Sequence, residues 1–197
     1  MATHRQIFNV FLVKPSHYDR DGYPIRWYRS LVPSNSLACM YGLTEDCAAR
    51  QVLGPDVEFR ITLVDEVNDR VRPKRLIAQA RRDGGRAILA LTGVQSNQFP
   101  RAMDIARPFL KEGIAVCVGG FHVSGCISML PDMPEDLKQA QAEGVSFFLG
   151  EAEEQRLDGV FRDAWMDPDM NKYDLYQRVS HHPVMSDEEW DEAYEGA

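Results

Sequence analysis

The chain has 197 residues, of which 44% are hydrophobic and 26% are charged. These values are typical of one globular domain with a short tail, and they exclude a disordered or fibrous protein. The net charge is -8; six acidic residues lie near the end, and the other acids nearly balance the 22 basic residues. With no basic face, we expect no nucleic-acid partner. No apolar run approaches the roughly 20 residues of a membrane helix, so we also expect no membrane partner.

The start of the chain predicts a strand, a helix and a second strand. Ile7 to Val13 is an apolar run that ends at Lys14-Pro15 without a small-residue cleavage site. It predicts a strand and not a signal peptide, and with it a cytoplasmic protein. Apolar residues recur at helical spacing from Leu37 to Ala48, with Ser36 as the expected N-cap. Residues 57–64 predict the second strand, because apolar and polar residues alternate in its first half.

Three more strands and four more helices follow. Apolar runs predict strands at 87–91, 114–118 and 145–149, and periodicity predicts helices that begin at Pro73, Phe99, Pro134 and Leu157. This alternation predicts a three-layer α/β fold, flavodoxin-like or Rossmann-like, with a five-stranded parallel sheet of order 2-1-3-4-5. We expect the domain to span residues 1–166. Residues 167–197 are expected to form an acidic C-terminal tail, in which Ser186 and Glu189 offer a helix-capping box.

Ligands of such sheets bind beyond the carboxyl ends of the strands. Three of the five ends carry glycine: Gly93, the Gly119-Gly120 pair and Gly150. Glycine lets a ligand or a neighbouring backbone come close, although it can also serve only to end a strand. The sequence holds no GxGxxG, P-loop or GxSxG motif, and no acceptor Asp follows the third strand. The loop after the first strand also lacks the hydroxyls and glycines of a flavin phosphate site.

Short motifs stand at the ends of the last two strands. They are Gly119-Gly120-Phe121-His122 and Gly150-Glu151-Ala152-Glu153, and Thr92-Gly93-Val94-Gln95 lies upstream. Their order and spacing resemble the cobalamin-binding domain of cobalamin-dependent radical S-adenosylmethionine proteins, over roughly residues 7 to 165. The resemblance implies a base-off corrin over the strand ends, with its nucleotide tail inserted beside the sheet. A bulky cofactor with many amides needs glycine clearance and scattered polar partners, which these ends provide.

The resemblance also implies a set of cofactor-binding residues. These are Asp65, Glu66, Thr92, Gly93, Val94, Gln95, Gly119, Gly120, Phe121, His122, Gly150 and Glu151. The first two would border the corrin amides, the group at 92–95 would line the tail or the corrin edge, and Gly119-Gly120 would let the tail pass. Gly150 and Glu151 would close the far side.

Two departures from the family bear on chemistry. Better-known cobalamin domains carry Asp-x-His-x-x-Gly after the first strand, whereas here Pro15 precedes His17 by two and Gly22 follows it after four residues. We therefore interpret His17 as a surface residue and His122 as a positioning residue, and assign no metal ligand. The sequence also lacks CxxxCxxC, so we expect no iron–sulfur cluster. Residues 182–190 resemble a segment beyond the catalytic barrel of those proteins, or else form an ordinary acidic helix.

The leading hypothesis is a cobalamin-binding module without radical chemistry of its own. It would be a remnant, a cofactor carrier, or a subunit that lends cobalamin to a protein partner or a separate radical domain. The alternative is a flavodoxin-like regulatory or interaction domain that binds another small ligand or a protein. An enzyme acting alone ranks third, because spacing establishes no pair of nucleophile and base, and no catalytic residue is assigned.

Overall fold

A five-stranded parallel sheet forms the centre of the molecule in the computed structural model, which describes residues 5–27 and 34–166. Its strands are β1 (Gln6–Lys14), β2 (Val57–Asp65), β3 (Ala87–Leu91), β4 (Ala115–Gly119) and β5 (Ser146–Phe148). Their order is β2-β1-β3-β4-β5, and all four pairings are parallel. The predicted flavodoxin-like α/β fold and strand order are therefore confirmed. The predicted tail, residues 167–197, lies outside the described residues.

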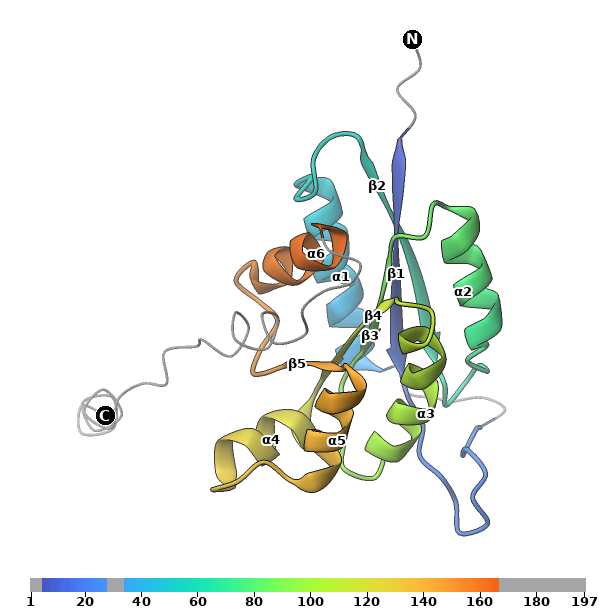
Figure 1. The fold of residues 1–197 in the computed structure, drawn as a ribbon, viewed down its shortest axis with the longest axis vertical. Coiled ribbons are helices and arrows are strands. Elements are labelled where there is room, and N and C mark those ends of the chain that lie inside the picture. Colours follow the sequence, from blue (N-terminus) through green and yellow to red (C-terminus); the bar gives the residue numbers. More distant parts are fainter. Residues whose placement is uncertain (1–4, 28–33, 167–197) are drawn as a thin grey trace, which may run out of the picture.

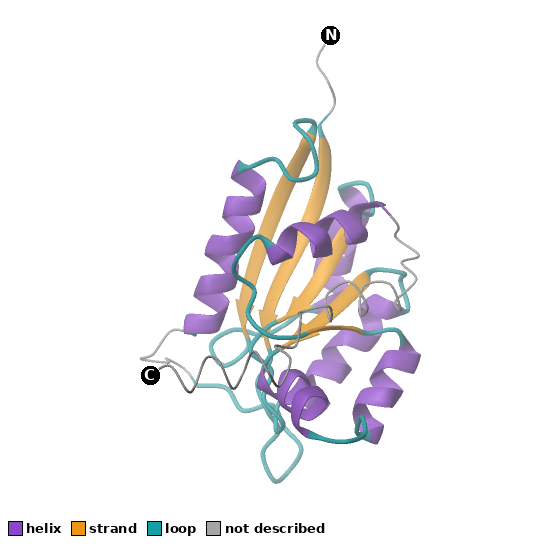
Figure 2. Ribbon diagram, turned by 90° about the vertical axis from the view of Figure 1, so that its left-hand side faces the viewer, coloured by secondary structure: helices purple, strands orange, loops and turns teal. Residues whose placement is uncertain are grey.

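Helices cover both faces of the sheet (Figures 1 and 2). They are α1 (Asn35–Ala49), α2 (Pro73–Arg82), α3 (Phe99–Leu110), α4 (Phe121–Met129), α5 (Glu135–Glu143) and α6 (Arg156–Met166). Helices α1 and α6 pack on one face, and α2, α3 and α5 pack on the other. Within the described ranges, no helix is both long and apolar enough to cross a membrane.

Two details of the helices differ from the predictions. The helix α4 was not expected, because Gly125 and two β-branched residues lower its helix propensity and its apolar residues do not fall on one face. The N-cap of α1 is Ser34 and not Ser36: the Ser34 hydroxyl accepts a hydrogen bond from the Leu37 amide at 3.3 Å. Helix α1 therefore begins earlier than the apolar periodicity indicates.

The two faces of the sheet carry separate hydrophobic cores. Alternation along β1 sends Phe11 and Val13 toward α2 and α3, and Phe8, Val10 and Leu12 toward α1 and α6. At the C-terminal end of α1, Arg50 binds both carboxylate oxygens of Asp158 in α6, at 2.6 and 2.7 Å. This ion pair fixes the two helices to each other.

Candidate functional site

A pocket of about 510 Å³ opens between the sheet and the pair α1 and α6, at the carboxyl ends of β3, β4 and β5. Its volume is within the range of roughly 300–1,000 Å³ that holds small-molecule ligands and cofactors. The sheet and α6 supply an apolar floor of Ile88, Ala90, Cys117, Phe148, Leu157, Val160 and Phe161, and Met40 and Leu43 of α1 continue it. Asn35, Ser36, Thr92, Ser124, Glu151 and Glu153 add polar groups.

Small side chains on the central strands create this space. Ala90 of β3 pairs in register with Cys117 of β4, and both line the pocket. Their neighbours along the strands, such as Leu89, Val116 and Val118, are bulky and pack into the core on the opposite face. The alternation of small and large residues therefore leaves one face of the sheet filled and the other hollow near the strand ends.

The strand-end glycines serve the fold as well as the pocket. Gly120 has a φ of 138°, and a Cβ there would lie 2.2 Å from the backbone nitrogen of Val94. Gly93 has a φ of 61°, and its Cβ would lie 3.0 Å from Cβ of Ser36 in α1. These two positions need glycine because neighbouring segments of this chain come close. Gly119 differs, since a Cβ there would meet the Phe148 side chain at 3.3 Å, within the pocket lining.

Thr92 places an unsatisfied polar atom in the lining. It is 5% exposed, and its hydroxyl has no hydrogen-bond partner among the described residues. A buried hydroxyl without a partner costs free energy, which a hydrogen bond to a water molecule or to a ligand would recover.

The charge and thiol chemistry of the pocket favour binding over catalysis. Its lining includes the carboxylates of Glu151 and Glu153 and, among the described residues, no Lys, Arg or His. Burial raises the pKa of the Cys117 thiol to about 12, so this cysteine is a neutral, weakly reactive part of the floor. Cys39, on α1, is exposed at the same pocket.

Seven of the twelve residues implied by the family resemblance line this pocket. They are Thr92, Gly93, Gly119, Gly120, Phe121, Gly150 and Glu151. The fold brings these residues together because β3, β4 and β5 are neighbours whose carboxyl ends meet at one edge. Phe121 is 73% exposed, so its ring faces solvent beside the pocket.

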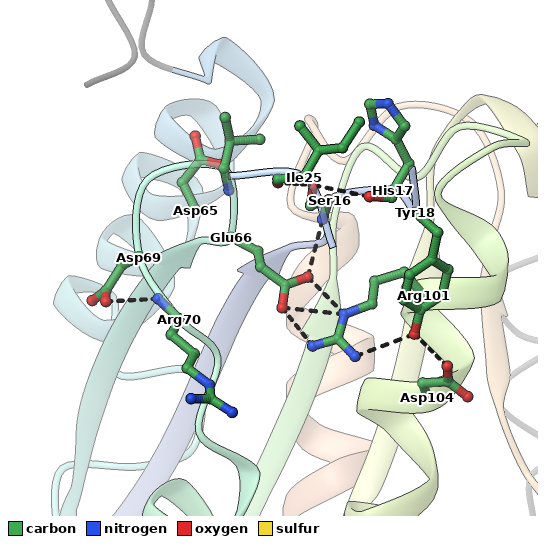
Figure 3. A network of polar contacts seen from close by, with 11 residues as sticks. Ser16, His17, Tyr18, Ile25, Asp65, Glu66, Asp69, Arg70, Arg101 and Asp104 are labelled. Carbon is green, nitrogen blue, oxygen red and sulfur yellow. Dashed lines mark hydrogen bonds and ion pairs between the residues drawn. The ribbon is translucent and has the colours of Figure 1, made fainter. Parts of the chain in front are cut away.

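The two acids after β2 lie outside the lining and have local partners. Asp65 accepts a hydrogen bond from the Val67 amide at 3.1 Å and so closes its own turn. Glu66 is 1% exposed and binds the Arg101 guanidinium at 2.6 Å, while the Ser16 amide donates to it at 3.2 Å (Figure 3). These bonds hold both side chains outside the pocket lining.

The remaining three residues connect strand-end loops. The Val94 amide donates to the Gly119 carbonyl at 3.0 Å, and the His122 amide donates to the Val94 carbonyl at 3.0 Å. Gln95 is exposed, and its amide donates to the Gln98 side chain. The His122 ring lies outside the lining, between Ser96 and Asp136. The strand-end loops next to the pocket are thus connected by Val94, Gln95 and His122, which do not line it.

A polar network fixes the loop after β1 at the same edge (Figure 3). Arg101 of α3 contacts Glu66 and donates to the Tyr18 hydroxyl, which in turn donates to Asp104. The pKa of Arg101 is raised, chiefly by its hydrogen bonds to Glu66. Burial, followed by the bond to Asp104, raises the pKa of Tyr18. The loop carrying His17 is therefore held beside β2 and α3, and His17 does not line the pocket.

Sequence reasoning missed the helical wall of the pocket. Asn35, Ser36, Cys39, Met40 and Leu43 of α1, together with the lining residues of α6, were not assigned to the site. One signal was available: alternate positions of β3 and β4 carry Ala90, Cys117 and Gly119, which are too small to fill the space under a helix.

Comparison of the chain with protein-family models, with curated proteins and with solved structures gave no match.

Proposed function

We propose that this chain is a cobalamin-binding module that holds the cofactor in its base-off form, with the nucleotide tail in the pocket against α1 and α6. One observation carries the proposal: an apolar slot of about 510 Å³ opens between the glycine-bearing ends of β3, β4 and β5. An aromatic base with an attached sugar requires a slot of this kind, with apolar walls and few polar contacts.

The residues present fit the cofactor in three respects. The tail would pass Gly119 and reach the small Ala90 and Cys117 on the floor, while the Thr92 hydroxyl would gain the hydrogen bond that it lacks. The corrin would lie over the strand ends beside the exposed ring of Phe121. When bound, cobalamin would supply a cobalt centre for alkyl transfer, and the chain's own residues would bind, orient and shield it.

The proposed role is that of a carrier which acts with a protein partner or a separate radical domain. The pocket lining contains acidic side chains. Among the described residues it contains no base paired with a nucleophile, which agrees with binding rather than turnover at this site. The second candidate is a regulatory domain that binds another small ligand. Among the described residues no histidine lines the pocket, and this observation favours the second candidate. Such a ligand would be aromatic and without strong negative charge.

The purified chain tests the proposal directly. It is mixed with hydroxocobalamin or methylcobalamin at micromolar concentration, passed over a desalting column and examined by visible spectroscopy. Retention of corrin with a base-off spectrum is the expected result. Loss of all corrin on the column would contradict the proposal and leave the second candidate.

A cavity-filling variant locates the bound tail. Ala90→Ile extends a side chain into the slot, so we expect it to abolish retention while stability stays equal or rises by about 1 kcal/mol. Ala78→Ile, on the exposed surface of α2, is the matched control and should retain corrin. Equal retention by both variants would place the corrin elsewhere.

A further inference from the structure

A polar cluster outside the pocket joins three elements near the strand ends. Ser96 comes from the loop before α3, His122 from α4 and Asp136 from α5. Nδ1 of His122 lies 3.1 Å from the Ser96 hydroxyl, and Nε2 lies 3.2 Å from a carboxylate oxygen of Asp136. None of the three lines the pocket, so the cluster is independent of the proposed cofactor site.

The carboxylate of Asp136 fixes the tautomer of the imidazole. An ionised carboxylate only accepts hydrogen bonds, so Nε2 carries the proton and donates a hydrogen bond to Asp136. Nδ1 then presents its lone pair to the Ser96 hydroxyl. His122 is 8% exposed, and its ring packs on Phe99 with centroids 4.5 Å apart, which holds it in this orientation. Hydroxyl, imidazole and carboxylate thus stand in the order of nucleophile, general base and orienting acid.

Ser96 is accessible, and two backbone N–H groups without an acceptor in the described part of the chain belong to it and to the next residue. It is exposed and lies three residues before Phe99, where α3 begins. The backbone N–H groups of Ser96 and Asn97 have no acceptor among the described residues. Both precede the N-terminus of α3, and the dipole of a helix favours negative charge near that end.

We propose that Ser96, His122 and Asp136 form a nucleophilic site that hydrolyses small, activated carboxylic esters. The Ser96 oxygen bonds to the ester carbonyl carbon while Nδ1 of His122 takes its proton. The bond to the leaving alcohol breaks, and the alcohol departs with that proton. Water then gives a proton to Nδ1 and its hydroxyl to the acyl carbon. The bond between the acyl carbon and the Ser96 oxygen breaks, that oxygen takes the proton back from Nδ1, and the carboxylic acid is released. The cycle needs no oxidant, reductant or cofactor.

Cys126 is the competing nucleophile, and it supplies a control. Its sulfur lies 3.7 Å from the same Nδ1, farther than the Ser96 oxygen, and the residue is only partly exposed. The shorter contact and the greater exposure assign the reaction to Ser96. Cys126→Ala therefore keeps the proposed nucleophile and removes the alternative.

The full chain is assayed for p-nitrophenol release from p-nitrophenyl acetate, and a fluorophosphonate adduct is mapped by mass spectrometry. We expect the adduct on Ser96, and we expect Ser96→Ala to reduce the rate to that of buffer. Asp136→Asn should lower the rate by at least ~10-fold, because the imidazole loses its orienting charge. Cys126→Ala should stay within about twofold of the parent chain.

A rate in Ser96→Ala equal to that of the parent chain would overturn the assignment. So would an adduct on Cys126, or a parent rate no higher than that of buffer. Corrin retention is measured on the same Ser96→Ala sample and should be unchanged. A circular dichroism spectrum equal to that of the parent chain confirms that the variant is folded, and this check does not depend on the cofactor proposal.

Discussion

Thr92 is the residue whose chemistry points most directly to a ligand. Its hydroxyl is buried in the pocket lining and has no partner among the described residues. Thr44 provides a contrast, since it is also buried but donates to the Met40 carbonyl at 2.7 Å. A satisfied hydroxyl stabilises the fold, whereas an unsatisfied one costs stability until a ligand binds it.

We predict opposite effects of Thr92→Val on stability and on binding. Removing the unpaired hydroxyl should leave the free energy of unfolding unchanged or raise it by about 1 kcal/mol. Corrin affinity should fall by about 5- to 10-fold, because one hydrogen bond to the ligand is lost. Urea unfolding and a binding titration measure the two quantities. Thr44→Val should instead destabilise the domain, and unchanged corrin affinity in Thr92→Val would remove Thr92 from the site.

Gly120 and Gly119 are neighbours, but a side chain would meet different obstacles at the two positions. At Gly120 the positive φ and the approach of Val94 exclude a side chain, whereas at Gly119 the nearest contact is the Phe148 side chain. We predict that Gly120→Ala lowers the free energy of unfolding by roughly 2–4 kcal/mol, through strain and a backbone clash. Gly119→Ala should cost about 1 kcal/mol or less and act mainly on corrin binding. Equal unfolding midpoints for the two variants would contradict this distinction.

At the scale of elements, the pocket depends on how α1 and α6 are held. Asp158 of α6 is 7% exposed and accepts two hydrogen bonds from Arg50, and the Cys47 thiol donates to it at 3.3 Å. The hydrogen bonds from Arg50 hold the pKa of Asp158 below its usual value. The ion pair therefore joins α1 to α6, the two helices that form a wall of the pocket.

This ion pair makes stability depend on pH. A carboxyl with a depressed folded pKa stabilises the fold above its unfolded pKa of about 4, and that contribution is lost as pH falls through the folded value. We predict that Asp158→Asn lowers the free energy of unfolding by about 1–3 kcal/mol at pH 7, and by less below pH 4. Urea unfolding at several pH values measures the difference. Asp46→Asn is the exposed control, and an equal, pH-independent loss in both variants would exclude the proposed role.

The sequence predicts the strands well because four of them are apolar runs close to the observed strands and β2 carries an alternating pattern. Strand β3 matches at both ends, and β4 differs by one residue. Helix α4 was missed because Gly125 and its β-branched residues give no helical signal. The strand-end glycines of the pocket are visible in the sequence, but the wall from α1 and α6 is not. Its position depends on which face each helix covers, which periodicity within one helix does not specify.

His122 shows why a motif is a weaker guide than a contact. The Gly119-Gly120-Phe121-His122 segment lies at the end of β4, but its side chains reach two different places. Phe121 lies beside the pocket, whereas the His122 ring contacts Ser96 and Asp136. Because α4 begins at Phe121, consecutive side chains point in different directions around the helix.

At the scale of the whole molecule, one edge of the sheet carries two separate chemistries. The side toward α1 and α6 is hollow and apolar, as a slot for a cofactor tail requires. The side toward α3 and α5 holds the cluster of Ser96, His122 and Asp136, which has the order of a nucleophilic site. The Glu66–Arg101 ion pair fixes the loop after β1 at this edge. The parallel sheet thus positions both sites without placing them in contact.

If the pocket holds the nucleotide tail of cobalamin, a corrinoid without this tail should bind more weakly. Isothermal titration of the full chain with methylcobalamin and with methylcobinamide, which lacks that tail, tests it most directly. We predict that methylcobalamin binds at least ~100-fold more tightly, because only its tail can bury apolar surface in the slot. The Ala90→Ile variant should lose this preference. Equal affinity for the two corrinoids, or no heat from either, would contradict the account.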